Sequence, residues 1–236
     1  MELVAVRRAG PDDQSGECQH ADRLAAPRSI GPDGASSCNV HKWLGNLAQA
    51  RAHATFCFEV ASSGDNLVEQ AFAHSNLGIL DRLEGSHITA REHLTRAMGL
   101  FEQAGQRRGI GICHRQLGML DEHLSRYQDA QAHLDQALSL FQELGDVMNQ
   151  ADTHHNLAVV HRGLGTPGTA HEHATTALAL ACQISHVQGQ ADAHAELAHL
   201  ARSTGDHTTA NVHLRQAHDL HQRLHHAIEA EPPEPR

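Results

Sequence analysis

Histidine is the residue type with the greatest capacity for chemistry in this chain, which contains 23 histidines among 236 residues. An imidazole can bind a metal ion, and it gains a proton near pH ~6.5. Many of the histidines fall into two series with a constant spacing of 40 residues, which would suit a ladder used for metal binding or acid sensing. The first series is His74, His114, His154 and His194, and the second is His53, His93, His133, His173 and His213.

The simpler interpretation of both series is duplication of a residue that half-buried helix positions tolerate. Members of one series stand a full repeat apart, which is too far for shared coordination. We therefore interpret each series as a copied structural residue rather than as a site.

A local cluster is the better metal candidate. His218, His221 and His225 follow each other at spacings of three and four, so they share one face of a helix. Three imidazoles on one face are a possible zinc or nickel site. No carboxylate completes the set, so we prefer adventitious binding and predict no cofactor.

Motifs for catalysis are missing. The only lysine, Lys42, follows His41, so no phosphate-binding Gly-Lys-Ser/Thr loop exists, and covalent lysine chemistry is excluded over most of the chain. His171-Glu172-His173 is too compact for the His-Glu-x-x-His metalloprotease motif. We expect a non-catalytic protein.

The apolar residues also recur with a period of 40 residues, and the helices that they predict must position the histidines. In residues 66–105 the apolar residues are spaced by three and four along two segments, which predicts two amphipathic helices joined by a turn. Such a period is typical of a helical solenoid. The recurring positions are Leu77, Leu117, Leu157 and Leu197; Ala90, Ala130, Ala170 and Ala210; and Ala97, Ala137, Ala177 and Ala217.

Turns and caps agree with this reading. Glycine marks the turn between the two helices, with Ser125 as the exception, and a side chain that can cap the second helix follows. The turn glycines are Gly85, Gly165 and Gly205, and the expected caps are Ser86, Thr166 and Asp206.

These patterns divide the chain into four parts. We predict a disordered lead over 1–34, a partial repeat over 35–65, four full repeats over 66–228, and an acidic, proline-rich tail over 229–236.

The composition limits the classes of partner and the cellular compartments that we expect for this protein. The net charge of −10 argues against general affinity for nucleic acid. No segment is apolar enough for a signal peptide or a membrane span, and the five cysteines contain no Cys-x-x-Cys pair. We expect a cytoplasmic protein without a membrane or direct nucleic-acid partner.

Leu77-Gly78, Gly85, Ala90 and Ala97 resemble the signature of tetratricopeptide repeats, and the resemblance covers about 38–228. It implies an all-α, right-handed solenoid of antiparallel helix pairs. The 40-residue variant, with phrases such as "AHLDQALSLFQELGD", is similar to the C-terminal repeat arrays of bacterial signal-responsive transcription regulators. Their upstream DNA-binding and nucleotide-binding domains are not recognisable here.

The resemblance also implies a peptide-binding groove at three positions of each first helix. Four arginines among them would form a positive strip that pairs with an acidic peptide. The alternative is that these arginines are ordinary solvated residues. The implied positions are Ser75, Ile79 and Arg82; Arg115, Met119 and Glu122; His155, Val159 and Arg162; and Ala195, His199 and Arg202.

Three functions remain open. The first is a scaffold for a protein or peptide partner, such as an acidic peptide, in bacterial signalling or transcription control. The second is a sensor of a small molecule, a metal or pH that acts through the histidines. The third is a fragment of a larger regulator.

Overall fold

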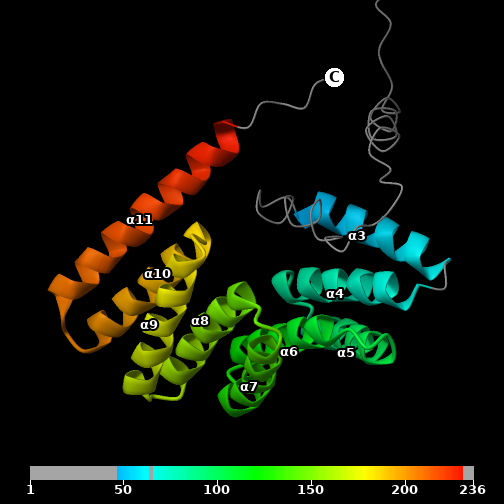
Figure 1. Cartoon of the computed structure of the whole chain (residues 1–236), viewed down its shortest axis with the longest axis horizontal. Helices are drawn as coiled ribbons and strands as arrows, with labels where there is room; N and C mark the ends of the chain where they lie inside the picture. The colour runs from blue at the N-terminus through cyan, green and yellow to red at the C-terminus, as the bar shows by residue number, and fades with distance from the viewer. Residues whose placement is uncertain (1–46, 64–65, 231–236) are drawn as a thin grey trace, which may run out of the picture. The chain divides into compact units, whose positions relative to one another are not determined.

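The computed structural model of the protein describes residues 47–63 and 66–230, without the side chains of 225–230. The predicted lead therefore lies outside the described residues, as does most of the predicted tail. All regular structure in these ranges is α-helical (Figure 1). The helices are α3 (Leu47–Ser62), α4 (Leu67–Leu83), α5 (His87–Gln103), α6 (Arg107–His123), α7 (Tyr127–Glu143), α8 (Val147–Gly163), α9 (Pro167–Gln183), α10 (Val187–Ser203) and α11 (His207–Ala230).

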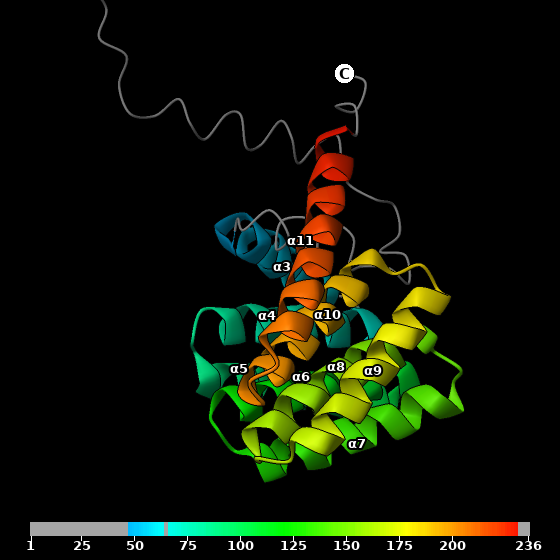
Figure 2. The same cartoon turned by 90° about the vertical axis from the view of Figure 1, so that its left-hand side faces the viewer.

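The helices form consecutive pairs, which confirms the predicted all-α solenoid. The extensive contacts are within the pairs α4–α5, α6–α7, α8–α9 and α10–α11, and each pair then packs on the next. The last helix is longer than the others, and its final turns extend beyond α10 (Figures 1 and 2). No helix within the described ranges is both long and apolar enough to cross a membrane.

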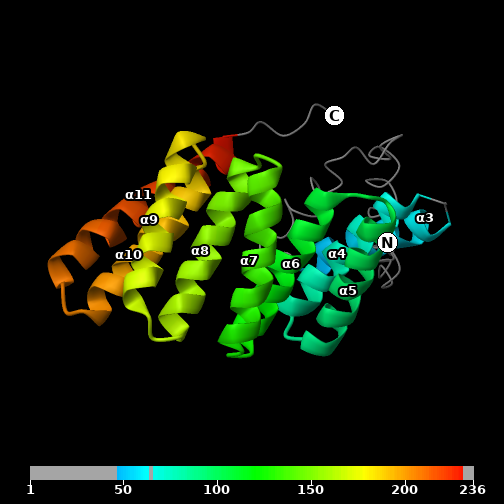
Figure 3. The ribbon, with the colours of Figure 1, turned by 60° about the horizontal axis from the view of Figure 1, so that its bottom comes forward.

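The first helices of the repeats form one row and the second helices another. Successive first helices touch directly, α4 on α6, α6 on α8 and α8 on α10. Figure 3 shows the helices side by side in chain order. We call the row of α4, α6, α8 and α10 the inner row, and its surface carries the predicted groove positions.

Small and large residues alternate to let the two helices of a repeat approach. A side chain carbon added to Gly118 would lie 2.7 Å from Cγ of Leu134 on the paired helix, and at Gly78 the same atom would lie 2.8 Å from Cγ of Leu94. In the third repeat both members of this contact are alanines, Ala158 and Ala174, and both are buried. The corresponding residues of the fourth repeat are Ala198 and Leu214, so a small residue on the first helix is the feature that all four repeats share.

The turns within repeats end each first helix by the same geometry. Gly85 has φ +79°, its amide bonds to the carbonyl of Arg82, and the next amide bonds to the carbonyl of Asp81. This is the Schellman arrangement, which needs a left-handed residue after the helix. Ser125 adopts the same conformation with φ 57°.

The expected caps are confirmed at only one of three positions. The Asp206 carboxylate accepts a hydrogen bond from the amide of Thr209 at 3.0 Å. Ser86 and Thr166 do precede their helices, but neither side chain caps. Thr166 instead donates its hydroxyl hydrogen to the carbonyl of His161, at 3.0 Å. A hydroxyl has a choice of acceptors here, whereas a carboxylate can only accept.

Candidate functional site

The predicted groove arginines all lie on the inner row, but the structure gives them different partners. Arg115 of α6 bonds through Nη1 to Oδ2 of Asp152 at 3.2 Å, and through Nη2 to Oδ1 of Asn149 at 3.3 Å. Both partners belong to α8, so this ion pair joins two consecutive repeats. It also neutralises one of the charges expected in a positive strip.

Arg162 makes a similar link between the third and fourth repeats. Its Nε donates to Oε1 of Glu196 at 2.6 Å, and Nη2 donates to Oε2 at 3.4 Å. Glu196 is buried, and its hydrogen bonds raise the pKa of Arg162. Because the guanidinium of Arg162 bonds to both oxygens of a buried carboxylate, this ion pair fixes how the third repeat packs on the fourth.

Arg82 is the buried member of the set, with 8% of its surface exposed. Its Nε is buried and has no hydrogen-bond partner among the described residues, and the same is true of Nε of Arg115. Burial lowers the pKa of Arg82, and the positive charge of Arg115 acts in the same direction, while Glu122 opposes both. Two guanidinium groups thus lie close to each other on α4 and α6.

The remaining predicted positions differ in exposure. Arg202 and His199 of α10 are exposed, whereas Met119 and His155 are half-buried. The Nδ1 atom of His155 is buried without a partner among the described residues. The inner row therefore carries a mixed polar surface in which two of its four arginines are already paired.

The two histidine series meet in the structure. Within one series the members stay apart, as their spacing predicts, but each member of the first series bonds to the member of the second series 19 residues later. Each bond joins the Nδ1 atoms of two half-buried rings on the two helices of one repeat. We call these the four histidine pairs: His74–His93 at 2.8 Å, His114–His133 at 3.1 Å, His154–His173 at 2.9 Å and His194–His213 at 3.0 Å.

The pairs are nearly identical in geometry. Their ring centroids lie 5.1–5.3 Å apart and the ring planes meet at 32–41°. A bond between two Nδ1 atoms needs one protonated and one unprotonated nitrogen. The constant spacing of 19 residues was the sequence signal for this arrangement, and each repeat copies the pair as a unit.

Burial lowers the histidine pKa values in all four pairs. The pKa of His74 falls to about 4, with smaller contributions from His93 and Arg96, and that of His154 also falls to about 4, with a contribution from His173. Burial likewise lowers the pKa of other pair members, namely His114, His133, His173 and His194. Each pair therefore stays neutral in the fold to a lower pH than a free imidazole would.

A third side chain adjoins each of the first three pairs. In the first and second repeats it is an aspartate, whose Oδ2 lies 3.9 Å from Nε2 of His93 (Asp81) and of His133 (Asp121). In the third repeat it is His161, whose ring stacks on His173 at a centroid distance of 5.2 Å and 13°. The equivalent residue of the fourth repeat is Ala201.

The two aspartates also receive an arginine from the preceding repeat. Arg51 pairs with Asp81 at 2.7 Å, and Arg91 pairs with Asp121. Asp121 is buried, and its Oδ2 has no hydrogen-bond partner among the described residues. A hollow lined by Arg91, Arg126, Asp129 and His133 lies beside it.

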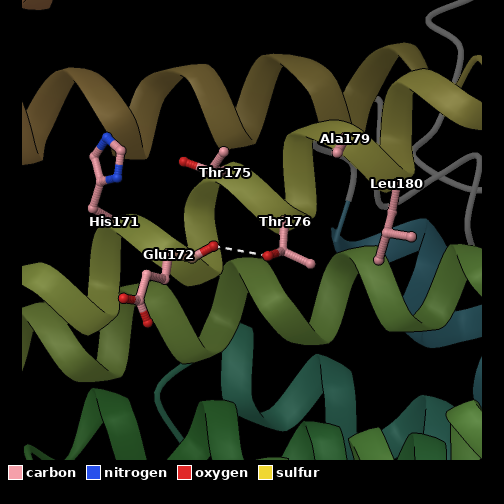
Figure 4. Close-up of a pocket in the computed structure, with 6 residues that line it drawn as sticks. All are labelled: His171, Glu172, Thr175, Thr176, Ala179 and Leu180. Atoms are coloured by element: carbon pink, nitrogen blue, oxygen red, sulfur yellow. Dashed lines mark hydrogen bonds between the residues drawn. The ribbon is translucent and has the colours of Figure 1, made fainter.

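The remaining candidate sites are the C-terminal histidines and a pocket on α9, and they have fewer features that indicate a function. His218 and His221 are exposed, and the side chain of His225 lies outside the described residues. Among the side chains that the structure describes, no three His, Cys, Asp or Glu groups are arranged to hold a metal ion. Figure 4 shows a shallow pocket on α9, lined by one helix from His171 to Leu180, with Thr176 donating to the carbonyl of Glu172 at 2.8 Å.

Residues 110–183, from α6 to α9, match the family model for the tetratricopeptide repeat. The repeat period and the helix pairs agree with this match, so the chain contains tetratricopeptide repeats over this range. No curated protein matches it in sequence.

Solved structures share the fold at low identity. BtubC (BKLC) from P. vanneervenii has a TM-score of 0.64 at 18% identity, covering 94% of this chain and 92% of BtubC. Rap protein in complex with Competence and Sporulation Factor has a TM-score of 0.71 at 16% identity, covering 78% of this chain and 53% of Rap. MamA from Desulfovibrio magneticus RS-1 has a TM-score of 0.51 at 13% identity, covering 79% and 92%.

Proposed function

We propose that this protein is a non-catalytic scaffold that binds a protein or peptide segment along its inner row. Buried nitrogen atoms without partners at three predicted groove positions, Arg82, Arg115 and His155, are the main support. A buried donor left unpaired costs about 1–3 kcal/mol. A segment that shifts the side chains covering these atoms and supplies an acceptor recovers that loss. The complex of the structurally similar Rap protein with Competence and Sporulation Factor is consistent with this use of the fold.

The chemistry of the partner follows from the charges that remain. Arg115 and Arg162 are held by acidic residues of the next repeat. Arg202 is exposed and makes no ion pair within the described ranges. We therefore place a carboxylate of the partner at Arg202, and the more neutral part of the partner over Met119.

We assign the scaffold to the cytoplasm and to bacterial signalling or transcription control. The resemblance of the 40-residue repeats to regulator arrays supports the process. The three cysteines in the described part of the chain, Cys57, Cys113 and Cys182, are free thiols, which supports a reducing compartment.

Photo-crosslinking from the two rows tests the binding surface. Two variants are made, one with a photoreactive residue at Met119 on the inner row and one with it at Thr175 in the pocket on α9. Each variant is irradiated in cells. We expect a specific partner to crosslink from Met119 and not from Thr175. Equal crosslinking from both positions would contradict the proposal.

The partner's charge is tested in the same system. Arg202→Glu should reduce the crosslink at least tenfold, because it places like charges together. Arg215→Glu, the same change at an exposed position of α11 outside the inner row, should leave the crosslink intact. Loss in both variants would show a general charge effect rather than a site.

A further inference from the structure

Each histidine pair can accept one proton but not two. A singly protonated pair keeps its bond, because an imidazolium donates to a neutral imidazole. A doubly protonated pair places two N–H donors and two positive charges at a separation of 2.8–3.1 Å, with no acceptor between them. The two helices of that repeat must then move apart.

The surroundings decide how easily each pair holds its first proton. The groups facing the pairs are Arg96 and Asp81 in the first repeat; Asp121, Arg91 and Asp129 in the second; and His161, Asp135 and Glu172 in the third. In the fourth repeat His194 faces His213. The first two repeats therefore offer a buried aspartate as a countercharge.

The third and fourth repeats lack this buried countercharge, because His161 and Ala201 stand at the position of the aspartate. His161 takes the place of the aspartate and adds a third imidazole, stacked on His173. The carboxylates that face His173, those of Asp135 and Glu172, belong to exposed residues, so solvent screens them more than it screens the buried Asp121. Burial lowers the pKa of His173, and the positive charge of His161 acts in the same direction.

One of the links between repeats is missing at the same place, although Arg115 still pairs with Asp152 across this junction. Arg51 and Arg91 reach the aspartates of the first and second repeats. Before the third repeat, Gln131 stands at the position of these arginines, and His161 stands at the position of the aspartates. No arginine–aspartate pair therefore joins the second repeat to the third at these positions.

We propose that the histidine pairs make this solenoid acid-sensitive, and that opening begins in the third and fourth repeats, where His161 and Ala201 replace the aspartate that supports the first two pairs. The device is a regulatory one. A fall in pH separates α8 from α9 and α10 from α11 while the repeats of α4 to α7 stay packed, and the surface that depends on α8 and α10 is altered first.

Hydrogen exchange of the full chain, resolved by peptide and corrected for intrinsic rates, tests this order. Between pH 7.5 and pH 5.5 we expect protection in α8 to α11 to fall at least tenfold more than protection in α4 to α7. A uniform loss over all repeats, or no loss anywhere, would overturn the proposal.

A substitution that restores the aspartate isolates the cause. His161→Asp should remove most of the acid-induced loss of protection in α8 and α9. His171→Asp is the matched control, because His171 is an exposed histidine on α9 outside the pairs, and it should respond like the natural protein. Asp121→His should transfer the same sensitivity to α6 and α7. An unchanged pH response in His161→Asp would refute the role of His161 even if the array opens in acid.

Discussion

Single backbone positions explain why most turns of this array carry glycine. The residue after each first helix needs a positive φ, which costs a residue with a side chain about 1–2 kcal/mol. Glycine meets the need at Gly85, Gly165 and Gly205, while Ser125 adopts φ 57° at the equivalent place. Ser125 is therefore a strained position whose hydroxyl makes no helix cap.

Ser125→Gly should raise the free energy of unfolding by about 1 kcal/mol, since it removes that strain. Urea denaturation followed by circular dichroism measures the change. The reverse substitution at the matching turn, Gly165→Ser, should lower stability by a similar amount. A destabilised Ser125→Gly protein would show that the serine side chain has a compensating role.

The residue scale also shows where sequence reasoning stops. Leu and Ala spacing identifies the buried stripes, because helical periodicity acts within one helix. The partners of the arginines lie 34 and 37 residues away, at Glu196 and Asp152, and depend on how one repeat rotates on the next. No local period carries that information, so a positive strip was expected where two paired charges exist.

At the scale of the helix pair, the decisive contact is between a small residue and a large one. Gly118 lets α6 approach α7, and an added carbon there would meet Cγ of Leu134 at 2.7 Å and the carbonyl oxygen of Ala130 at 3.1 Å. The third repeat meets the same need with two alanines. The first helix therefore needs a small residue here, and glycine is required in the second repeat by the close approach of Leu134.

Gly118→Ala should destabilise the protein by about 1–3 kcal/mol through overpacking. Leu134→Ala alone should cost about 2–5 kcal/mol through the cavity it leaves. The double variant should lose clearly less than the sum, because it reproduces the Ala158–Ala174 contact; strict additivity would contradict this. Gly99→Ala, on a helix with open space around the added carbon, should stabilise instead.

The helix pair is also the scale at which the histidine arrangement arises. The two series were visible in the sequence, and the spacing of 19 residues between them is the same in all four repeats. The two histidines of a pair lie on opposite sides of a turn, so the pattern within one helix does not predict their contact. The contact forms only when the two helices pack as an antiparallel pair.

For the whole molecule, the histidine pairs make stability depend on pH. A histidine in the unfolded chain binds its proton near pH ~6.5. In the fold the pKa of His74 and of His154 is about 4, so between these values the unfolded chain holds more protons. By linkage, stability is complete above pH ~6.5 and is lost as the pH falls towards about 4.

A set of four substitutions, one in each pair, tests this dependence. Replacing His74, His114, His154 and His194 with Gln keeps a hydrogen-bonding side chain in each pair but removes four imidazoles whose pKa is lowered by burial in the fold. The melting temperature of this variant should fall less steeply between pH 7 and pH 5 than that of the natural protein. Each excluded proton contributes at most about 1.4 kcal/mol per pH unit, and solvent screening reduces that value.

Exposed histidines provide the control. Gln at His123, His171, His207 and His221 removes the same number of imidazoles from the surface. That protein should follow the natural pH profile. If both sets flattened the profile equally, the number of histidines rather than their pairing would set the response.

The matched contacts between Gly or Ala and its partner lie inside single repeats, and this fixes how the array can change length. A forty-residue deletion or duplication cut between repeats carries both members of the contact together. A cut within repeats that joined α6 to α9 would place Gly118 against Ala174 and leave a void. The gene can therefore grow or shrink by whole helix pairs, and the joints between repeats are the places where such an edit leaves the protein foldable.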